Sequence, residues 1–337
     1  MCGRYYRRSD KQRIAEAFRL GKLPPDFVLP PDFNIAPTTY QPVIRQNRDT
    51  LERELVLMQW SLVPNYTKDL KTLRAYSTIN ARAEGILKAQ MWRTPIRKHR
   101  CLVPADGFYE WRRPDPKTKI PYAFRVKDKE PFAFAGIWDA WKETPEAVAT
   151  RIKRERDSIE LRMRLLETVV ADDTVDSRAV GKIAGYDPDL RERLEAQINP
   201  SPQWLQSFAI ITTDANEAMA PIHDRMPVIL HPKDYDRWLD RGEVERPPID
   251  LLRPYEAEEM ASALANKLVG NAKNNGPAML NSAEPPPPSS STSLPLIFKL
   301  FDPLRQLIEA NVDTTYSSRQ YSVLIGMRRE SRRVRRW

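Results

Sequence analysis

Short apolar runs separated by turn residues dominate the chain between residues 40 and 232. The runs are rich in Val, Ile, Phe, Tyr and Trp and are bounded by Pro, Gly and Asp, which is the pattern of β-strands. Because long helices rarely intervene, the spacing favours mixed or antiparallel sheets over a doubly wound α/β fold. The predicted strands are QPVIR (41–45), ELVLMQWSLV (54–63), RCLVPADGFYEW (100–111), PYAFRV (121–126), PFAFAGIWDAW (131–141), SFAIITT (207–213) and MPVILHP (226–232).

Helical periodicity interrupts this pattern in four places. QRIAEAFRL at 12–20 predicts a short helix, and EAEEMASALANKL at 256–268 predicts another. Between them, residues 143–204 are predicted to be a helical insertion between two strands. Its first helix has one apolar face, and DPDLRERLEAQI at 187–198 begins with an Asp-Pro start signal. Charges in the insertion nearly balance, so a solvated charged face is favoured over a binding patch. The apolar positions of its first helix are Ile152, Ile159, Met163, Leu166 and Val170.

The carboxyl-terminal part changes composition. EPPPPSSSTS at 284–293 cannot pack a core and is predicted to be a linker, followed by a poorly ordered basic tail at 294–337. Non-specific attraction to phosphate is the alternative role for that tail. The predicted fold is α+β and mainly β, with twisted mixed or antiparallel, barrel-like sheets, flanking helices, the insertion and a disordered tail. The core domain is assigned to residues 2–283.

Composition narrows the class of protein. The chain has 337 residues, 41% of them hydrophobic, and no apolar run near the roughly 18 residues that span a bilayer. Two cysteines without an export signal favour a reducing compartment, so we expect a cytoplasmic protein, nucleoid-associated if bacterial. The net charge is +9, of which +5 falls in residues 286–337, so the core alone gives a weak nucleic-acid signal.

Cys2 is the first candidate for chemistry. If Met1 is removed, Cys2 carries an α-amine and a thiol on adjacent carbons, and this aminothiol traps aldehydes as a closed ring. Nearby cations such as Arg4 are expected to lower the pKa of the thiol. Cys101, within an apolar run, is predicted to be a core residue.

Two further residues can move protons. Glu110 lies between Tyr109 and Trp111, and apolar surroundings raise a carboxyl pKa towards the range useful for proton transfer. His223, between a turn and a strand, can act as acid or base near pH 7, with an ordinary turn histidine as the alternative. His99 and His231 are predicted to be surface residues, and the sequence shows no metal-ligand spacing.

An amide and several guanidinium groups suit a sugar-phosphate substrate. Asn80 and Arg82 alternate on a predicted strand and therefore share one face. Arginine binds phosphate bidentately, while Asn holds a neutral oxygen or nitrogen. Arg4 and Arg225 are further candidates for phosphate contacts.

A series of motifs, taken in order, resembles the SRAP (SOS-response-associated peptidase) family. The resemblance covers residues 2–142 and 205–283. Its motifs are MCGR (1–4), FNIAPT (33–38), WSLVP (60–64), STINARAEG (77–85), CLVPADGFYEW (101–111), ITTDAN (211–216), PIHDRMPVIL (221–230) and VGNAKNNGP (269–277).

The resemblance implies a role for each of the reactive residues. Cys2, exposed after methionine removal, forms a thiazolidine with the aldehyde of an abasic site in single-stranded DNA. Glu110 shuttles protons, His223 helps to open the sugar ring, and Asn80 matches the family's site asparagine. No cofactor or metal is implied, and the partner is abasic single-stranded DNA, at replication forks, bound by a monomer away from membranes.

The resemblance also implies DNA contacts and leaves rivals open. Arg4, Arg82 and Arg225 match phosphate-contacting arginines, and Asn34 lies near the family's site. The family often has Gly at the position of Ser61, and its aromatic wedge is represented here by Asn65-Tyr66, so Tyr66 is the candidate for base stacking. Lyase side activity and self-cleavage of Met1 are compatible with this chemistry. A cysteine or amino-terminal-nucleophile peptidase and a non-enzymatic DNA-binding module remain the alternatives.

Overall fold

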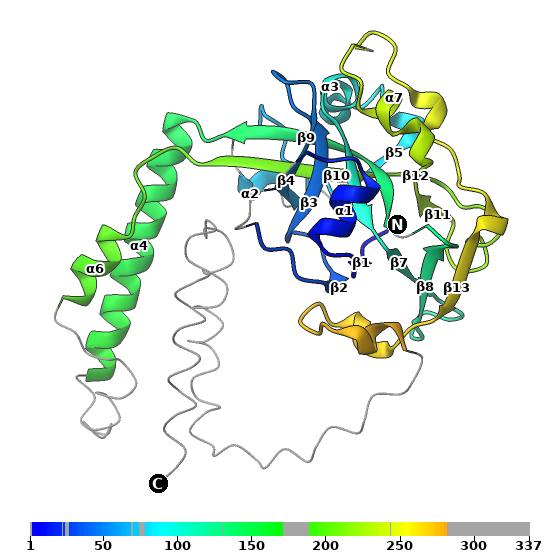
Figure 1. Ribbon diagram of the computed structural model, residues 1–337. Helices are drawn as coiled ribbons and strands as arrows, with labels where there is room; N and C mark the ends of the chain where they lie inside the picture. Colours follow the sequence, from blue (N-terminus) through cyan, green and yellow to red (C-terminus); the bar gives the residue numbers. More distant parts are fainter. Residues whose placement is uncertain are drawn as a thin grey trace. The chain divides into compact units, whose positions relative to one another are not determined.

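The computed structural model describes residues 2–21, 23, 27–68, 70–73, 78–129, 131–170, 189–242 and 244–281 (Figure 1). By its internal contacts the chain divides into residues 1–285 and 286–337. The predicted linker at 284–293 and the predicted tail at 294–337 both lie outside the described residues. None of the described helices is long and apolar enough to cross a membrane.

Strands make up most of the described core. They are β1 (Tyr5–Arg7), β2 (Asp32–Ile35), β3 (Tyr40–Gln46), β4 (Arg53–Trp60), β5 (Asn80–Arg82), β6 (Arg100–Ala105), β7 (Gly107–Arg112), β8 (Ile120–Val126), β9 (Phe132–Lys142), β10 (Trp204–Asp214), β11 (Arg225–Pro227), β12 (Ile229–Leu230) and β13 (Met260–Leu264). The α-helices are α1 (Lys11–Ala17), α2 (Leu70–Leu73), α3 (Gln90–Lys98), α4 (Pro145–Val170), α6 (Leu190–Ala196) and α7 (Tyr235–Leu239).

Five strands close into a barrel. Hydrogen bonding runs β10–β4–β3–β6–β9, and β9 pairs again with β10, so the sheet returns to its starting strand. β4 pairs with β10 in parallel at Ser207 and Phe208, and β5 continues along the same edge at residues 210–212. The end of the barrel at β5 therefore carries Asn80 and Arg82.

A second, antiparallel sheet has the order β13–β8–β7–β1–β2. One core of buried aromatic side chains contacts both this sheet and the barrel, with Tyr5, Trp60, Phe108 and Phe134 among its members. Tyr5 packs edge-on against Trp60 and Phe134 at centroid distances of 5.2 and 5.8 Å. A second core lies beneath α1, α3 and α7. Packing through Tyr5 thus fixes the amino-terminal strand against the barrel.

The turn before β7 holds the amino-terminal strand in place. Asp106 is fully buried, and its carboxylate accepts hydrogen bonds from Arg8 N (2.6 Å), Ser9 N (2.7 Å) and Ser9 Oγ (2.7 Å). A Cβ on Gly107 would lie 2.2 Å from the Tyr6 hydroxyl and 2.4 Å from Phe124 O, so only glycine allows this approach. The ADG part of the ADGFYEW motif is therefore the anchor of β1.

The insertion between β9 and β10 extends that strand pair. Lys142 and Trp204 are register partners, and Glu143 N donates to Gln203 O at 2.9 Å. Helix α4 follows at once, as Figure 1 shows beyond the ends of β9 and β10. Arg151 is buried and forms a bidentate ion pair with Glu143, with N–O distances of 2.9 and 3.0 Å. This pair anchors α4 to the end of the strands.

The predicted fold class is confirmed, and every predicted strand segment contains an observed strand. The helix expected at 256–268 is wrong, because residues 260–264 form β13 and pair with β8. His99 and His231 are half-buried rather than exposed, because their rings stack on Trp138 and Tyr255.

Candidate functional site

The amino-terminal segment brings Cys2 to the junction of the two sheets. Arg4 O accepts a hydrogen bond from Tyr109 N at 2.9 Å, which continues the pairing of β1 with β7. Asn80 Nδ2 donates to Cys2 O at 2.8 Å, which ties the same segment to β5. Cys2 is fully buried and belongs to the core that joins the sheets. Residues 80 and 2, far apart in sequence, are therefore in direct contact.

The thiol of Cys2 is held in its neutral form. Burial raises its pKa, and the negative charge of Glu110 adds to the effect. Arg4 lowers this pKa only slightly, through the hydrogen bond that its backbone O accepts from the thiol, because its guanidinium turns to Asn34 Oδ1 (2.9 Å) and Val269 O (3.3 Å). A thiol in this environment reacts only when a base accepts its proton.

Glu110 is such a group. It lies on β7 opposite Tyr122, with 4% of its surface exposed, and burial raises its pKa to about 7. Burial thus raises the carboxyl pKa of Glu110, as its apolar neighbours in the sequence predict. A carboxyl group with this pKa exists in both protonation states near neutral pH and can take up or release a proton.

His223 closes the site from the loop between β10 and β11. Hydrogen bonds from Ala220 N to Asn216 O (2.8 Å) and from His223 N to Met219 O (3.1 Å) shape this loop. The Nδ1 atom of His223 accepts from Arg225 N at 3.0 Å. Burial lowers the pKa of His223, which favours the neutral ring.

Electrostatic interactions connect three of these groups. The negative charge of Glu110 raises the pKa of the Cys2 thiol, and the positive charge of Arg113 lowers the pKa values of both Glu110 and His223, in each case after the larger effect of burial. Electrostatic influence of this kind falls off with distance, so the three side chains lie near one another.

Several buried polar atoms near Cys2 have no hydrogen-bond partner among the described residues. Buried polar groups are normally paired, and a group left over calls for a specific explanation such as a ligand. Here the atoms include donors and acceptors on both sheets. They are Arg4 Nε, Asn80 Oδ1, Thr212 Oγ1 and Arg225 Nε.

Two arginines share an acidic neighbour beside the site. Arg225 forms a bidentate pair with Glu84 at 2.9 Å and also contacts Asp214 at 2.6 Å. Arg225 lowers the pKa of Glu84 through hydrogen bonding, and the charge of exposed Arg82 contributes as well. Arg82 and Arg225 therefore flank one carboxylate, and part of their positive charge is compensated.

Asn34 and Tyr66 occupy different surroundings. Asn34 is buried, contacts Arg4, and donates through Nδ2 to Asn271 O and Asn274 O at 2.9 and 2.7 Å. It therefore positions the Arg4 side chain. Tyr66 is half exposed in the loop after β4 and shares no hydrogen bond or ion pair with the other site residues that the structure describes. Contacts within the described part of the chain thus link Cys2 to Asn80 and Glu110, and Arg4 to Asn34. Others link Arg225 to His223 and, through Glu84, to Arg82, whereas Tyr66 takes part in none of these contacts.

Sequence reasoning missed three residues at this site. Thr212 lies opposite Arg82 in the β5–β10 pair, and Glu84 and Asp214 hold Arg225. The alternation of ITTD along a predicted strand could have marked Thr212 as an inward polar residue. No sequence signal links Glu84 to Arg225, since 141 residues separate them. The described residues contain no group of three His, Cys, Asp or Glu side chains suited to a metal ion.

Comparison with protein families gives a match over most of the chain. The model of a family described as "SOS response associated peptidase (SRAP)" matches residues 1–160 and 186–272. A Bacillus subtilis protein named abasic site processing protein YoqW is 32% identical over 283 residues, covering 84% of this chain and 100% of the relative. Abasic site processing protein HMCES from Rattus norvegicus is 26% identical, covering 75% of this chain and 65% of the relative.

Solved structures agree in fold. A crystal structure of a protein from Bacteroides thetaiotaomicron has a TM-score of 0.59 at 22% identity, covering 84% of this chain and 100% of that one. A protein from Bordetella bronchiseptica has a TM-score of 0.51 at 21% identity, covering 78% and 99%. At these sequence identities the two matches show a shared fold and nothing about function.

Proposed function

Since the chain belongs to the SRAP family, we propose that it processes abasic sites in DNA by forming a covalent crosslink through Cys2. Relatives that span its core carry the name abasic site processing protein. The observation that carries the proposal is the proximity of Cys2, Glu110 and His223, with Asn80 bonded to the Cys2 carbonyl. An aldehyde is the group that a terminal aminothiol would trap there.

The reaction balances with one water released. After removal of Met1, the α-amine of Cys2 attacks C1′ of the open-chain abasic deoxyribose, and loss of water gives an imine. The sulfur then adds to the imine carbon, and the thiol proton passes to the ring nitrogen. The product is a thiazolidine, which is more durable than the imine because C1′ no longer carries the C=N bond that would activate loss of the 3′ phosphate. β-Elimination of the 3′ phosphate from the imine would give the proposed lyase side activity.

The neighbouring residues suit the proton transfers in these steps. Glu110, with a pKa of about 7, donates a proton to the departing water, and in the next step it accepts the proton of the buried thiol and passes it to the ring nitrogen. His223 assists opening of the sugar ring, since its neutral ring can exchange protons near pH 7. Asn80 holds the Cys2 carbonyl and leaves its Oδ1 for the substrate.

Phosphates next to the lesion are proposed to contact Arg4, Arg82 and Arg225. Arg4 Nε and Arg225 Nε are buried donors without a partner among the described residues, which supports this role. A phosphate that approaches Arg225 would replace exposed Asp214 as its second partner. Single-stranded DNA fits best, because a continuous duplex would keep the reacting sugar away from a buried thiol.

Intact-mass analysis after incubation with single-stranded DNA bearing one abasic site tests the proposal. We expect a denaturant-stable adduct equal to protein plus DNA minus one water. Cys2→Ala should abolish it, while Cys101→Ala, which removes the other buried thiol, should retain it in a folded protein. Glu110→Gln should slow formation by about 10²–10⁴-fold.

Blocking the amine separates this chemistry from its rivals. An uncleaved amino-terminal tag converts the Cys2 amine into an amide, which cannot form an imine, so the adduct should vanish while DNA affinity persists. The same adduct on a blocked protein would exclude a thiazolidine. Cleavage of a peptide substrate without any DNA adduct would instead support the peptidase, and binding without either reaction would support a DNA-binding module.

A further inference from the structure

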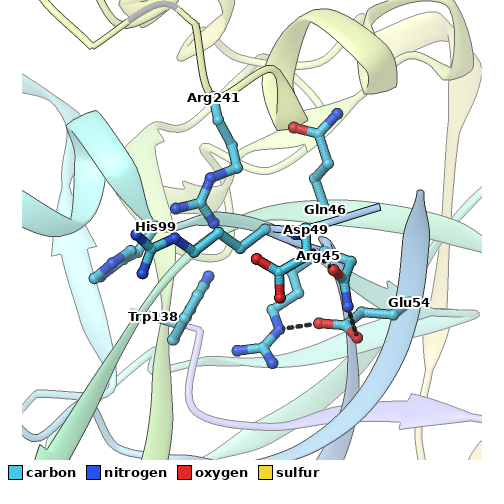
Figure 2. A pocket seen from close by; sticks show the side chains of 9 residues that line it. Arg45, Gln46, Asp49, Glu54, His99, Trp138 and Arg241 are labelled. Carbon is cyan, nitrogen blue, oxygen red and sulfur yellow. Dashed lines mark hydrogen bonds and ion pairs between the residues drawn. The ribbon is translucent and has the colours of Figure 1, made fainter. Parts of the chain in front are cut away.

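A cavity of about 280 Å³ lies beside the turn of the β3–β4 hairpin, away from Cys2 (Figure 2). The hairpin turn forms one side, and His99, Trp138 and Arg241 form the other; we refer to it as the hairpin pocket. In Figure 2 the side chain of Arg241 extends towards Asp49, with Trp138 and Arg45 beneath. Its volume is close to the lower end of ordinary ligand pockets, about 300–1,000 Å³.

The positive charge of the hairpin pocket comes from two arginines. Arg45 is already engaged, because its Nε lies 2.6 Å from Glu54 Oε1 and its guanidinium stacks on Trp138 at 4.5 Å. Arg48 and Arg241 line the pocket and have no ion-pair partner among the described residues. Asp49 is the remaining carboxylate. Two arginines against one aspartate leave one positive charge.

The walls of the pocket are fixed by packing. Trp138 is 8% exposed, and its ring stacks with His99 at a centroid distance of 4.4 Å in addition to Arg45. Asn47 Nδ2 donates to Glu54 Oε2 at 2.9 Å, and Asn47 Oδ1 accepts from Asp49 N at 2.8 Å. The turn and the wall are thus held before any ligand binds, which lowers the entropic cost of binding.

The pocket and the crosslinking site lie at opposite ends of the same hairpin. Glu54 is at the pocket, while Trp60 Nε1 donates to Ile79 O, next to Asn80. Trp60 lies six residue steps along the strand from Glu54, which corresponds to about 20 Å. A ligand group in the hairpin pocket therefore does not contact Cys2 or Glu110.

We propose that the hairpin pocket binds a phosphate group through Arg48 and Arg241. Guanidinium groups match phosphate oxygens bidentately, and the single excess positive charge matches the single negative charge of a phosphodiester. Trp138 is already stacked with Arg45 and His99, so it serves as a wall and not as a platform for a base. The phosphate belongs either to a DNA strand that extends from the crosslinking site or to a free nucleotide.

The experiment measures binding of an undamaged 20-nucleotide single strand to the full chain at several salt concentrations. Arg48→Ala/Arg241→Ala should weaken binding and reduce the slope of log K against log[salt] by about 0.7, the value for one phosphate on single-stranded DNA. Asp49→Asn should act in the opposite direction and strengthen binding. The control is Arg154→Ala/Arg156→Ala, which removes the same charge from exposed positions on α4.

Titration with inorganic phosphate and with deoxyadenosine monophosphate distinguishes the two sources. Saturable binding of either that is lost in the Arg48/Arg241 variant identifies a free-phosphate site. A changed salt slope without such binding identifies the DNA strand. An unchanged slope together with no phosphate binding overturns the proposal, as does an equal loss in the α4 control. Crosslinking to an abasic strand is read in the same samples, so failure here leaves the Cys2 chemistry separately tested.

Discussion

Glu110 links the candidate site to the stability of the whole chain. Its pKa is about 7 in the folded chain and 4.5 when it is not buried, so the folded state binds more protons between these values. The unfolding free energy should therefore fall as pH rises from 4.5 to 7, by about 3 kcal/mol from this residue. The Glu110→Gln variant lacks this ionisable group, so its unfolding free energy should not fall in this way. The difference in unfolding free energy, variant minus wild type, should therefore be about 3 kcal/mol larger at pH 8 than at pH 4.5.

Chemical denaturation of both proteins across this pH range measures the difference. Glu84→Gln is the control, because pairing with Arg225 lowers the pKa of Glu84. The ionised Glu84 stabilises the folded chain above its unfolded pKa, and this stabilisation is lost as pH falls. The pH dependence from Glu84 therefore has the opposite sign to that from Glu110. A constant difference between Glu110→Gln and wild type would show that Glu110 ionises normally.

The candidate reactive residues and the raised pKa of Glu110 could be predicted from sequence, but the electrostatic state of the Cys2 thiol could not. Burial of Glu110 follows from its aromatic neighbours, and the raised pKa was expected. The pKa of the Cys2 thiol moves in the direction opposite to expectation, because burial and the charge of Glu110 raise it while the Arg4 guanidinium contacts Asn34 and Val269. The direction of a long side chain depends on partners far away in sequence, and no local pattern encodes it.

At the scale of elements, the turn at Asp106 decides where the amino-terminal strand lies. Asp106→Ala leaves two backbone N–H groups and the Ser9 hydroxyl without their acceptor, so we expect a loss on the order of 3 kcal/mol in unfolding free energy. Crosslinking should slow at temperatures where the variant is folded, because β1 begins three residues after Cys2 and positions it. Asp106→Asn, which keeps one acceptor oxygen and can donate to Ser9 Oγ, should recover most of both.

Asp115 provides the matched control for this prediction. Its carboxylate also accepts two backbone N–H groups, from Lys117 and Thr118, but on an exposed turn. Water replaces the lost acceptor there, so Asp115→Ala should lower the unfolding free energy far less than Asp106→Ala. Equal losses in denaturation of the Asp106 and Asp115 variants would contradict the anchoring role of the buried turn.

Most strands follow from the sequence, whereas β13 does not. The apolar runs around Val43, Val103 and Phe134 alternate or are continuous as strands require, and all three residues lie in the barrel. Residues 260–264 have the alanine-rich composition of a helix, yet their backbone pairs with β8, whose edge would otherwise lack partners. Pairing between distant segments overrode local propensity at this position.

At the scale of the whole molecule, residues 286–337 carry nine Lys and Arg against four Asp and Glu. A chain ending at residue 285 should keep its crosslinking rate, because every group assigned to the chemistry lies in the core. Its affinity for undamaged single-stranded DNA at low salt should fall, with a shallower dependence on salt. Gel-shift titrations and adduct yields measure the two effects. Loss of crosslinking by a folded truncated chain would mean that the tail completes the site.

The strand pair that carries the insertion offers a place to attach a reporter. The proposed chemistry is incompatible with a fusion at the amino terminus, because any residue before Cys2 converts its amine into an amide. Glu143 and Gln203 are joined by a hydrogen bond, so the two ends of the insertion are as close as neighbouring strands, about 5 Å apart. A fluorescent domain whose own termini are adjacent could be spliced there in place of residues 144–202, giving a protein visible in cells with its reactive end untouched.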